Sequence, residues 1–180
     1  AIVRAFDVRP EVAEQVESMG AQFVTVDMEQ EVSADGYAKE MTAEQEAATA
    51  AMYDEEARNA DIVITTALIP GRPAPVLVRA DTVAAMGNGS VIVDMAAANG
   101  GNCELTVTDE KVVTDNLVTI LGYTDLAGRL AAQTSQLYGT NIVNLFKLLT
   151  PEKDGDLTLD MDDVVQRGIT VVHDGALMWP

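Results

Sequence analysis

The segment Asp61–Pro75 constrains the fold of this chain more than any other stretch. It begins with an apolar, β-branched run, Ile62–Thr66, whose lack of polar alternation is typical of a strand covered on both faces, as in a parallel sheet. Three prolines and a glycine between positions 70 and 75 then prevent strand or helix from continuing. Such a stop is typical of the carboxyl edge of an open α/β sheet, where ligands bind. A surface loop that only turns the chain fits this stretch equally well.

Composition excludes several classes of function. The 180 residues are 48% hydrophobic, which indicates a folded domain with a substantial core. A formal charge of -18 argues against binding to nucleic acid and to an anionic membrane surface, and we also expect no direct membrane insertion. Cys103 and His173 are the only residues of their types, which excludes an internal disulfide and leaves no basis for a zinc site or a Ser-His-Asp triad. No apolar run approaches about 20 residues and no signal peptide is visible, so we expect a cytoplasmic location.

Apolar runs alternate with helical patterns through the first two thirds of the chain. Val12, Val16 and Met19 share one helical face that ends at Gly20, and Thr42 with Gln45 has the spacing of a capping box. The acidic stretch from 27 to 39 lacks periodicity and is expected to be a long mobile loop. We therefore predict a Rossmann-like parallel α/β sheet with strands at 2–6, 22–26, 61–66, 91–93, 112–113 and 118–121, and helices at 10–19, 42–59 and 81–86.

The last third has a different pattern. Leucines and isoleucines from Leu126 to Leu149 predict one long helix, which Pro151 ends. Two strand-like runs follow, at 157–159 and 169–172. We predict two domains: residues 1–124 form a partial NAD(H)-binding domain, and residues 125–180 form the long helix and part of a companion domain.

Asp7 is the sharpest candidate for a binding residue. A carboxylate at the end of a strand in a dinucleotide fold can accept both hydroxyls of an adenosine ribose, and it repels the 2′-phosphate of NADP. The alternative is that Asp7 caps the helix that starts at Pro10. A G-x-G-x-x-G turn is absent, and Ala1 begins without Met inside a strand-like run. We therefore expect a piece of a longer polypeptide that lacks the first strand and the glycine-rich turn.

Other candidates are more ambiguous. Tyr37 stands in the expected mobile loop and could close over a ligand, although most exposed loop tyrosines do not. Asp94 could orient a ligand or a loop amide, and capping a turn is at least as common. The glycines at 100 and 101 permit either close approach to a ligand or a simple bend. By themselves, these residues indicate a cofactor domain of unspecified chemistry.

Six collinear segments resemble the alpha subunit of proton-translocating NAD(P) transhydrogenase, in its NAD(H)-binding domain I. They are AFDVRPEVAEQVESMGA, DGYAKEM, ITTALIPGRPAPVLV, GSVIVDMAAANGGNCE, LGYTDLAGRLAAQTSQLYGTN and DDVVQRGITVVHDG. The resemblance implies an oxidoreductase and translocase in which NADH passes hydride directly to NADP+ on a partner domain. It also implies NADP(H)-binding and membrane-spanning partner subunits, a homodimer of this domain, and a place at the membrane through those partners.

The resemblance also implies a set of cofactor-binding residues and no catalytic residue or metal ligand. Three lie along the adenosine ribose, three belong to the mobile loop, and the rest follow the central strands: Asp7, Val8, Arg9, Gly36, Tyr37, Ala38, Thr66, Ala67, Leu68, Asp94 and Asn99. Some family members have a glutamine in the helix after the mobile loop, at the position of Thr49 in this chain. The contact of that glutamine is therefore not carried over to Thr49. We expect weak or no NAD binding by the chain alone.

Two alternatives are an alanine dehydrogenase-like oxidoreductase and a non-catalytic nucleotide-binding protein. Alanine dehydrogenase carries a functional aspartate two residues before its paired glycines, and here that position is Ala98. A methyl group cannot transfer a proton, whereas direct hydride transfer between cofactors needs only positioning and exclusion of water. The substitution therefore favours transhydrogenase.

Overall fold

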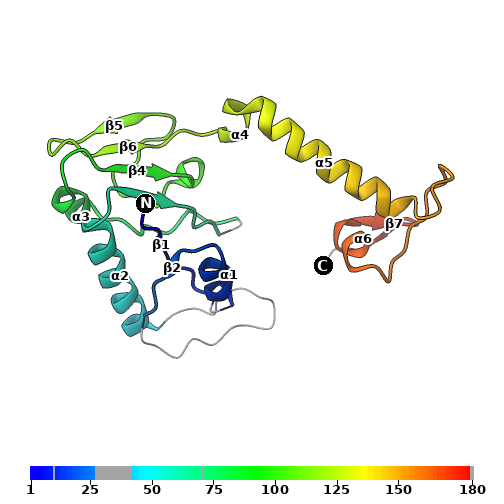
Figure 1. Cartoon of the computed structure of the whole chain (residues 1–180), viewed down its shortest axis with the longest axis horizontal. Coiled ribbons are helices and arrows are strands. Elements are labelled where there is room, and N and C mark those ends of the chain that lie inside the picture. Colours follow the sequence, from blue (N-terminus) through cyan, green and yellow to red (C-terminus); the bar gives the residue numbers. More distant parts are fainter. Residues whose placement is uncertain (10, 27–41, 70, 179–180) are drawn as a thin grey trace. The chain divides into compact units, whose positions relative to one another are not determined.

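The computed structural model describes residues 1–9, 11–26, 42–69 and 71–178. The chain divides into two compact units, Ala1–Thr124 and Asp125–Pro180 (Figure 1). The first unit contains the parallel strands, and the second contains the long helix.

The first unit is built on a four-stranded sheet with the order β3-β4-β6-β5. The strands β3 (Ile62–Thr65), β4 (Val91–Asp94) and β6 (Thr119–Leu121) run parallel, and β5 (Lys111–Val113) pairs antiparallel with β6. The predicted mixed α/β fold with a parallel sheet is therefore confirmed. Because the three parallel strands end at the same edge, the segments that follow β3 and β4 are brought together.

One face of this sheet carries the core. Ile92 of β4 and Ile120 of β6 stand opposite each other and are fully buried. The helix α3 (Ala80–Ala85) adds the fully buried Val83, as the predicted helix at 81–86 anticipated. The remaining members of this buried cluster are Val78, Met86, Cys103 and Val118. Burial of these side chains is the main stabilising contribution in the first unit.

The other face of β3 contradicts the prediction of a strand covered on both sides. Ile62 and Ile64 are each 63% exposed, whereas Val63 packs against the core. The backbone pairing of β3 is nevertheless as predicted, since Ile64 stands opposite Val93 in a parallel ladder. The exposure arises because no described residue packs over these two isoleucines, so an unbroken apolar run predicts the strand but not what covers it.

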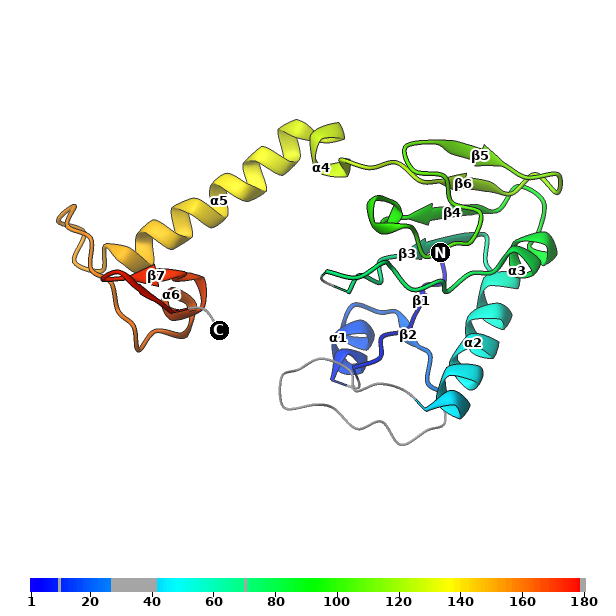
Figure 2. The same ribbon diagram turned by 180° about the vertical axis from the view of Figure 1, so that it is seen from behind.

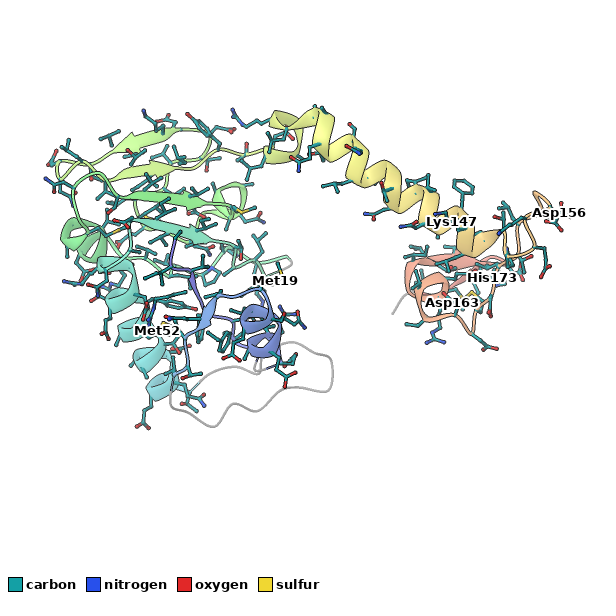
Figure 3. All side chains as sticks on the ribbon, in the orientation of Figure 1. Met19, Met52, Lys147, Asp156, Asp163 and His173 are labelled. Atoms are coloured by element: carbon teal, nitrogen blue, oxygen red, sulfur yellow. The ribbon has the colours of Figure 1, made fainter. Side chains whose placement is uncertain are left out.

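A second, smaller sheet pairs β1 (Arg4–Ala5) in parallel with β2 (Gln22–Phe23) across α1 (Val12–Ser18). The strands are shorter than predicted, and α1 begins at Val12 with Glu11 as its N-cap. Met19 lies beyond the helix and is 86% exposed, so its predicted place on the buried stripe is wrong (Figure 3). Gly20 has a positive φ of 83°, which explains the helix end that the sequence predicted.

The helix α2 (Ala43–Arg58) confirms the predicted capping box, because Thr42 accepts from the Gln45 amide and Gln45 reaches back to the Thr42 amide. It packs against α3, where the Thr82 hydroxyl donates to Asp54 (Figure 2). On the smaller sheet it places Tyr53 edge-on against Phe6, with ring centroids 5.4 Å apart. This helix therefore contacts both α3 and the residue that follows β1.

The second unit contains α4 (Leu126–Arg129), α5 (Ala131–Leu149), α6 (Val164–Ile169) and the hairpin of β7 (Val172–His173) with β8 (Ala176–Leu177). The predicted long helix is confirmed from 131 to 149, with a break at Leu130. The strand expected at 157–159 does not form, and residues 164–169 are helical. Figure 3 marks Asp163, whose carboxylate caps α6 by accepting from the Val165 and Gln166 amides.

Candidate functional site

The candidate site lies at the carboxyl edge of the parallel strands. Thr66, Ala67 and Leu68 follow β3, and Asp94 ends β4, so the register that pairs Thr65 with Asp94 brings these segments together. A short 3-10 helix, η1 (Ala97–Asn99), follows Asp94. The proline-rich segment after this strand predicts the carboxyl edge of a parallel sheet, where ligands bind, and these residues lie at such an edge.

The Asp94 carboxylate is buried and organises this edge. Its Oδ1 accepts from the Ala96 amide at 3.0 Å. Its Oδ2 accepts from the amides of Asn102 at 2.7 Å and Cys103 at 3.0 Å, and from the Thr106 hydroxyl at 2.6 Å. These donors satisfy a charge that would otherwise be costly to bury. Of the roles considered for Asp94, the structure shows that of orienting loop amides.

Two consecutive glycines allow the loop to return to Asp94. Gly100 has φ 100° and Gly101 has φ 85°, a backbone conformation that other residues rarely adopt. A Cβ at Gly101 would lie 2.7 Å from Asp94 Oδ2 and 3.0 Å from the Cβ of Thr106. Of the two interpretations of this glycine pair, the structure shows the bend, with the backbone of Gly101 pressed against the carboxylate.

Asn102 is the residue that the sequence reasoning missed. Its side chain is fully buried, and it makes three hydrogen bonds to the backbone of the proline-rich segment. Oδ1 accepts from the Ala67 amide at 3.0 Å, while Nδ2 donates to the carbonyls of Ala67 at 2.9 Å and Pro75 at 2.8 Å. In the sequence, the feature that could have indicated this residue is its position directly after two glycines and before an apolar cysteine.

The remaining candidates at this edge differ in exposure. Thr66 and Asn99 are exposed, and Leu68 is 53% exposed, so each could contact a ligand. Ala67 is half-buried and held through its backbone. The carbonyl of Asn99 accepts from the Ala74 amide at 2.8 Å, which fixes the backbone of η1 to the proline-rich segment.

Asp7 follows β1, and its carboxylate is paired with Arg9. Oδ1 accepts from the Arg9 backbone amide at 2.8 Å and from Nε at 3.0 Å, and Oδ2 accepts from the second guanidinium nitrogen at 3.1 Å. These hydrogen bonds lower the pKa of Asp7 against the raising effect of burial. The contacts of Asp7 are not those of a helix cap, because α1 has Glu11 as its N-cap and no side-chain cap bond. Val8 between them is half-buried.

Tyr53 is a second residue that the sequence did not indicate. Burial and, to a smaller extent, the negative charge of Asp7 together raise the pKa of Tyr53 to about 12. Its ring lies edge-on to Phe6, whose ring stacks with Phe23 at a centroid distance of 6.5 Å. Since Phe6 directly precedes Asp7, this aromatic group supports the end of β1.

Three candidates, Gly36, Tyr37 and Ala38, lie outside the described residues. Within the described ranges no group of three or more acidic, histidine or cysteine side chains could hold a metal ion. None of the helices in those ranges is both long and apolar enough to cross a membrane. The described part of the site thus combines carboxylates and backbone groups with polar side chains, one guanidinium and apolar side chains.

Parallel strands with polar groups at their carboxyl edge define this chain as an α/β domain with a candidate ligand site at that edge. The family model described as "Alanine dehydrogenase/PNT, C-terminal domain" matches residues 1–180. The chain therefore belongs to this family. Domains of this family bind NAD(H).

Individual relatives agree with this assignment. The chain is 57% identical over 176 residues to NAD(P) transhydrogenase subunit alpha of Haemophilus influenzae, covering 97% of this chain and 34% of that protein. A crystal structure of transhydrogenase from Sinorhizobium meliloti matches with a TM-score of 0.68 and 38% identity, covering 98% of this chain and 45% of that chain. Alanine dehydrogenase of Halomonas elongata is 32% identical over 135 residues, covering 73% of this chain and 36% of that protein. The chain thus spans about a third of the length of the Haemophilus relative.

Proposed function

We propose that this chain is part of the NAD(H)-binding component of a proton-translocating NAD(P) transhydrogenase. The observation that carries the proposal is 57% identity to a transhydrogenase alpha subunit over 97% of the chain. The local chemistry agrees, because Ala98 stands where alanine dehydrogenase has its functional aspartate. Ala98 is exposed on η1 and can neither accept nor donate a proton.

The residues at the carboxyl edge suit a dinucleotide. Asp7 is partly exposed and its lowered pKa keeps the carboxylate ionised, so it can accept the ribose hydroxyls and repel a 2′-phosphate. Val8 and Arg9 lie beside it, while Thr66, Ala67 and Leu68 offer a backbone and an apolar surface for the nicotinamide end. NADH, when bound, supplies the hydride that NADP+ on a partner domain accepts.

The other proposed cofactor contacts have different roles. Asn99 offers an exposed amide on η1, and Asp94 acts through the loop amides that it holds. Gly36, Tyr37 and Ala38 would close over the nucleotide and exclude water.

The open edges of the two sheets support a larger Rossmann sheet. In the described ranges β1 pairs only with β2, and β3 pairs only with β4. A further parallel strand between β1 and β3, followed by a helix over Ile62 and Ile64, would satisfy both free edges and cover the exposed face. A glycine-rich turn after that strand would hold the pyrophosphate. We therefore expect strong NADH binding only from the longer protein, and weak or no binding from these 180 residues alone.

The partners follow from the same proposal. The second unit, 125–180, would belong to a companion domain, and two copies of the whole NAD(H)-binding component would form a dimer. NADP(H)-binding and membrane-spanning subunits would complete the enzyme, which would hold this domain on the cytoplasmic side of the membrane.

Cofactor exchange tests the proposal. The full-length protein is mixed with NADH and an oxidised NADP analogue, in the presence and absence of the NADP(H)-binding domain. Hydride transfer that requires both cofactors and the partner domain is expected. NADH binding without transfer would instead support a nucleotide-binding protein without this activity, and NAD-dependent oxidation of alanine would support the alanine dehydrogenase alternative.

Asp7→Ala tests the proposed ribose site. We expect NADH binding to weaken at least about tenfold, because hydrogen bonds between ribose hydroxyls and a charged acceptor are lost. Stability should change little, since both side chains of the Asp7–Arg9 pair are partly exposed to solvent. The matched control is Asp115→Ala, which removes one negative charge from an exposed turn. An unchanged dissociation constant in Asp7→Ala would remove Asp7 from the site.

A further inference from the structure

Asn102 forms hydrogen bonds to both ends of the proline-rich segment that follows β3. Its side chain bonds Ala67, two residues after the strand ends, and Pro75, eight residues later. Its own carbonyl accepts from the amides of Leu77 at 2.7 Å and Val78 at 3.0 Å. One fully buried residue thus makes five hydrogen bonds to this segment and its exit, although Pro70 within the segment lies outside the described residues.

The segment has little else to define its conformation. Thr66, Leu68 and Ile69 are exposed and make no contribution to the buried core. Prolines remove backbone donors from the segment. The conformation at the mouth of β3 therefore depends on the Asn102 side chain, together with the bond from the Ala74 amide to the Asn99 carbonyl and a turn in which the Arg72 amide donates to the Ile69 carbonyl.

Asn102 is itself held in place from the sheet. Its backbone amide donates to Asp94 Oδ2 at 2.7 Å, and the positive φ of Gly101 directs the chain back to that carboxylate. Asp94 in turn ends β4, the strand whose Ile92 is fully buried. A rigid connection therefore runs from the core through Asp94 and Asn102 to Ala67.

We propose that Asn102 is a positioning residue for NADH: it holds the Thr66–Leu68 backbone in the conformation that receives the nicotinamide end of the cofactor. This inference rests on the proposed function, since it assigns Thr66–Leu68 to the cofactor site. Asn102 itself is fully buried and acts on the cofactor through Ala67. A segment that is already ordered binds with a smaller loss of conformational entropy than one that must be ordered on binding.

Asn102→Ala in the full-length protein tests this role, with Asn116→Ala as a matched control. Asn116 also donates its side-chain amide to backbone carbonyls, those of Val83, Ala84 and Met86, at the end of α3. Both variants lose buried or half-buried amide hydrogen bonds and should lower the melting temperature. Only Asn102→Ala should raise the dissociation constant of NADH, by at least about tenfold.

Steady-state hydride transfer separates positioning from general damage. In Asn102→Ala we expect KM for NADH to rise while kcat at saturating NADH is largely kept, since bound cofactor restores the segment. A merely structural role would lower the active fraction, and kcat would fall with KM unchanged. Hydrogen exchange gives a direct readout: the amides of Ala67 and Ala74 should exchange faster in the variant, and NADH should restore their protection.

The outcomes are distinct. Failure of the wild-type protein to bind NADH would contradict the proposed function and this inference with it. Wild-type binding together with an unchanged dissociation constant in Asn102→Ala would contradict the inference alone. If Asn102→Ala does not fold, hydrogen exchange of the wild-type protein provides the test. NADH is then expected to slow exchange of the Ala67 amide and of the Asn102 side-chain amide. The absence of both effects would overturn the inference.

Discussion

The two units of the chain differ in how many side chains each buries within its own structure. The first unit buries a continuous apolar cluster against one face of its sheet and satisfies a buried carboxylate within it. In the described part of the second unit, Gln166 is the one residue classed as buried, and α5 buries no side chain. Local signals suffice to form a helix, whereas a sheet edge with defined geometry requires a packed core.

The largest effect should come from the core of the first unit. Ile120→Ala is expected to lower the free energy of unfolding of that unit by about 2–5 kcal/mol, because it leaves a cavity at a fully buried position. Phe146→Ala on α5, where the side chain is 52% exposed, should change the stability of the 180-residue chain by less than about 1 kcal/mol. Urea unfolding followed by hydrogen exchange resolves the two units. Equal losses of unfolding free energy in Ile120→Ala and Phe146→Ala would contradict this difference between the two units.

Glycine substitutions sharpen the comparison further. Gly101→Ala should destabilise the first unit by about 2 kcal/mol, because φ is 85° and the new Cβ would lie 2.7 Å from Asp94 Oδ2. Gly139→Ala should instead stabilise α5 by about 0.5–1 kcal/mol, since nothing lies within 4 Å of its Cβ position. Thermal unfolding monitored by circular dichroism measures both. A destabilising Gly139→Ala would show that α5 is packed more closely than the structure indicates.

Helix caps should not distinguish the two units. Thr42→Ala removes the capping box of α2, and Asp163→Ala removes two bonds to the first turn of α6. Each is expected to cost about 1 kcal/mol, because a cap stabilises its own helix end whatever the surrounding core. Amide exchange in the first turn of each helix provides the measurement. A large loss from Asp163→Ala alone would indicate that α6 nucleates the second unit.

The smallest expected effect concerns the Asp7–Arg9 pair. The Arg9 hydrogen bonds lower the pKa of Asp7 below its ordinary value of 3.8, so the pair stabilises the fold above that value and loses its contribution as pH falls through the lowered pKa. Arg9→Gln should raise the pKa of Asp7 toward 3.8. The titration is followed by the carboxyl ¹³C shift of Asp7. An unchanged pKa in Arg9→Gln would show that the backbone amide of residue 9, and not the Arg9 guanidinium, lowers the pKa of Asp7.

Local patterns predicted much of the fold correctly. The Thr42–Gln45 capping box, the helix at 131–149 and the strands that contain Ile64 and Ile92 all follow from residue spacing. The errors have a common cause. Met19 and the run 157–159 have apolar composition, yet neither is covered by other described residues, and spacing alone cannot report which face is covered.

The candidate site was predictable in part. Asp94 and the paired glycines were candidates because they directly follow a predicted strand, at the edge where ligands bind, although a turn cap and a simple bend explained them equally well. Asn102 did not, because an asparagine in a loop is commonplace, and its importance depends on two backbone carbonyls at positions 67 and 75. The relevance of Tyr53 to Asp7 likewise depends on how α2 packs against β1.

The sequence by itself determined the alternation of strands and helices, the acidic surface and the stiff stop after the third strand. These features depend on properties of single residues and their near neighbours. The tertiary structure decided which face of β3 is covered, that Asp94 holds loop amides, and that Asn102 joins the two ends of the proline-rich segment. Those outcomes depend on pairs of residues brought together by parallel strand register, since hydrogen bonds and burial require contact in space.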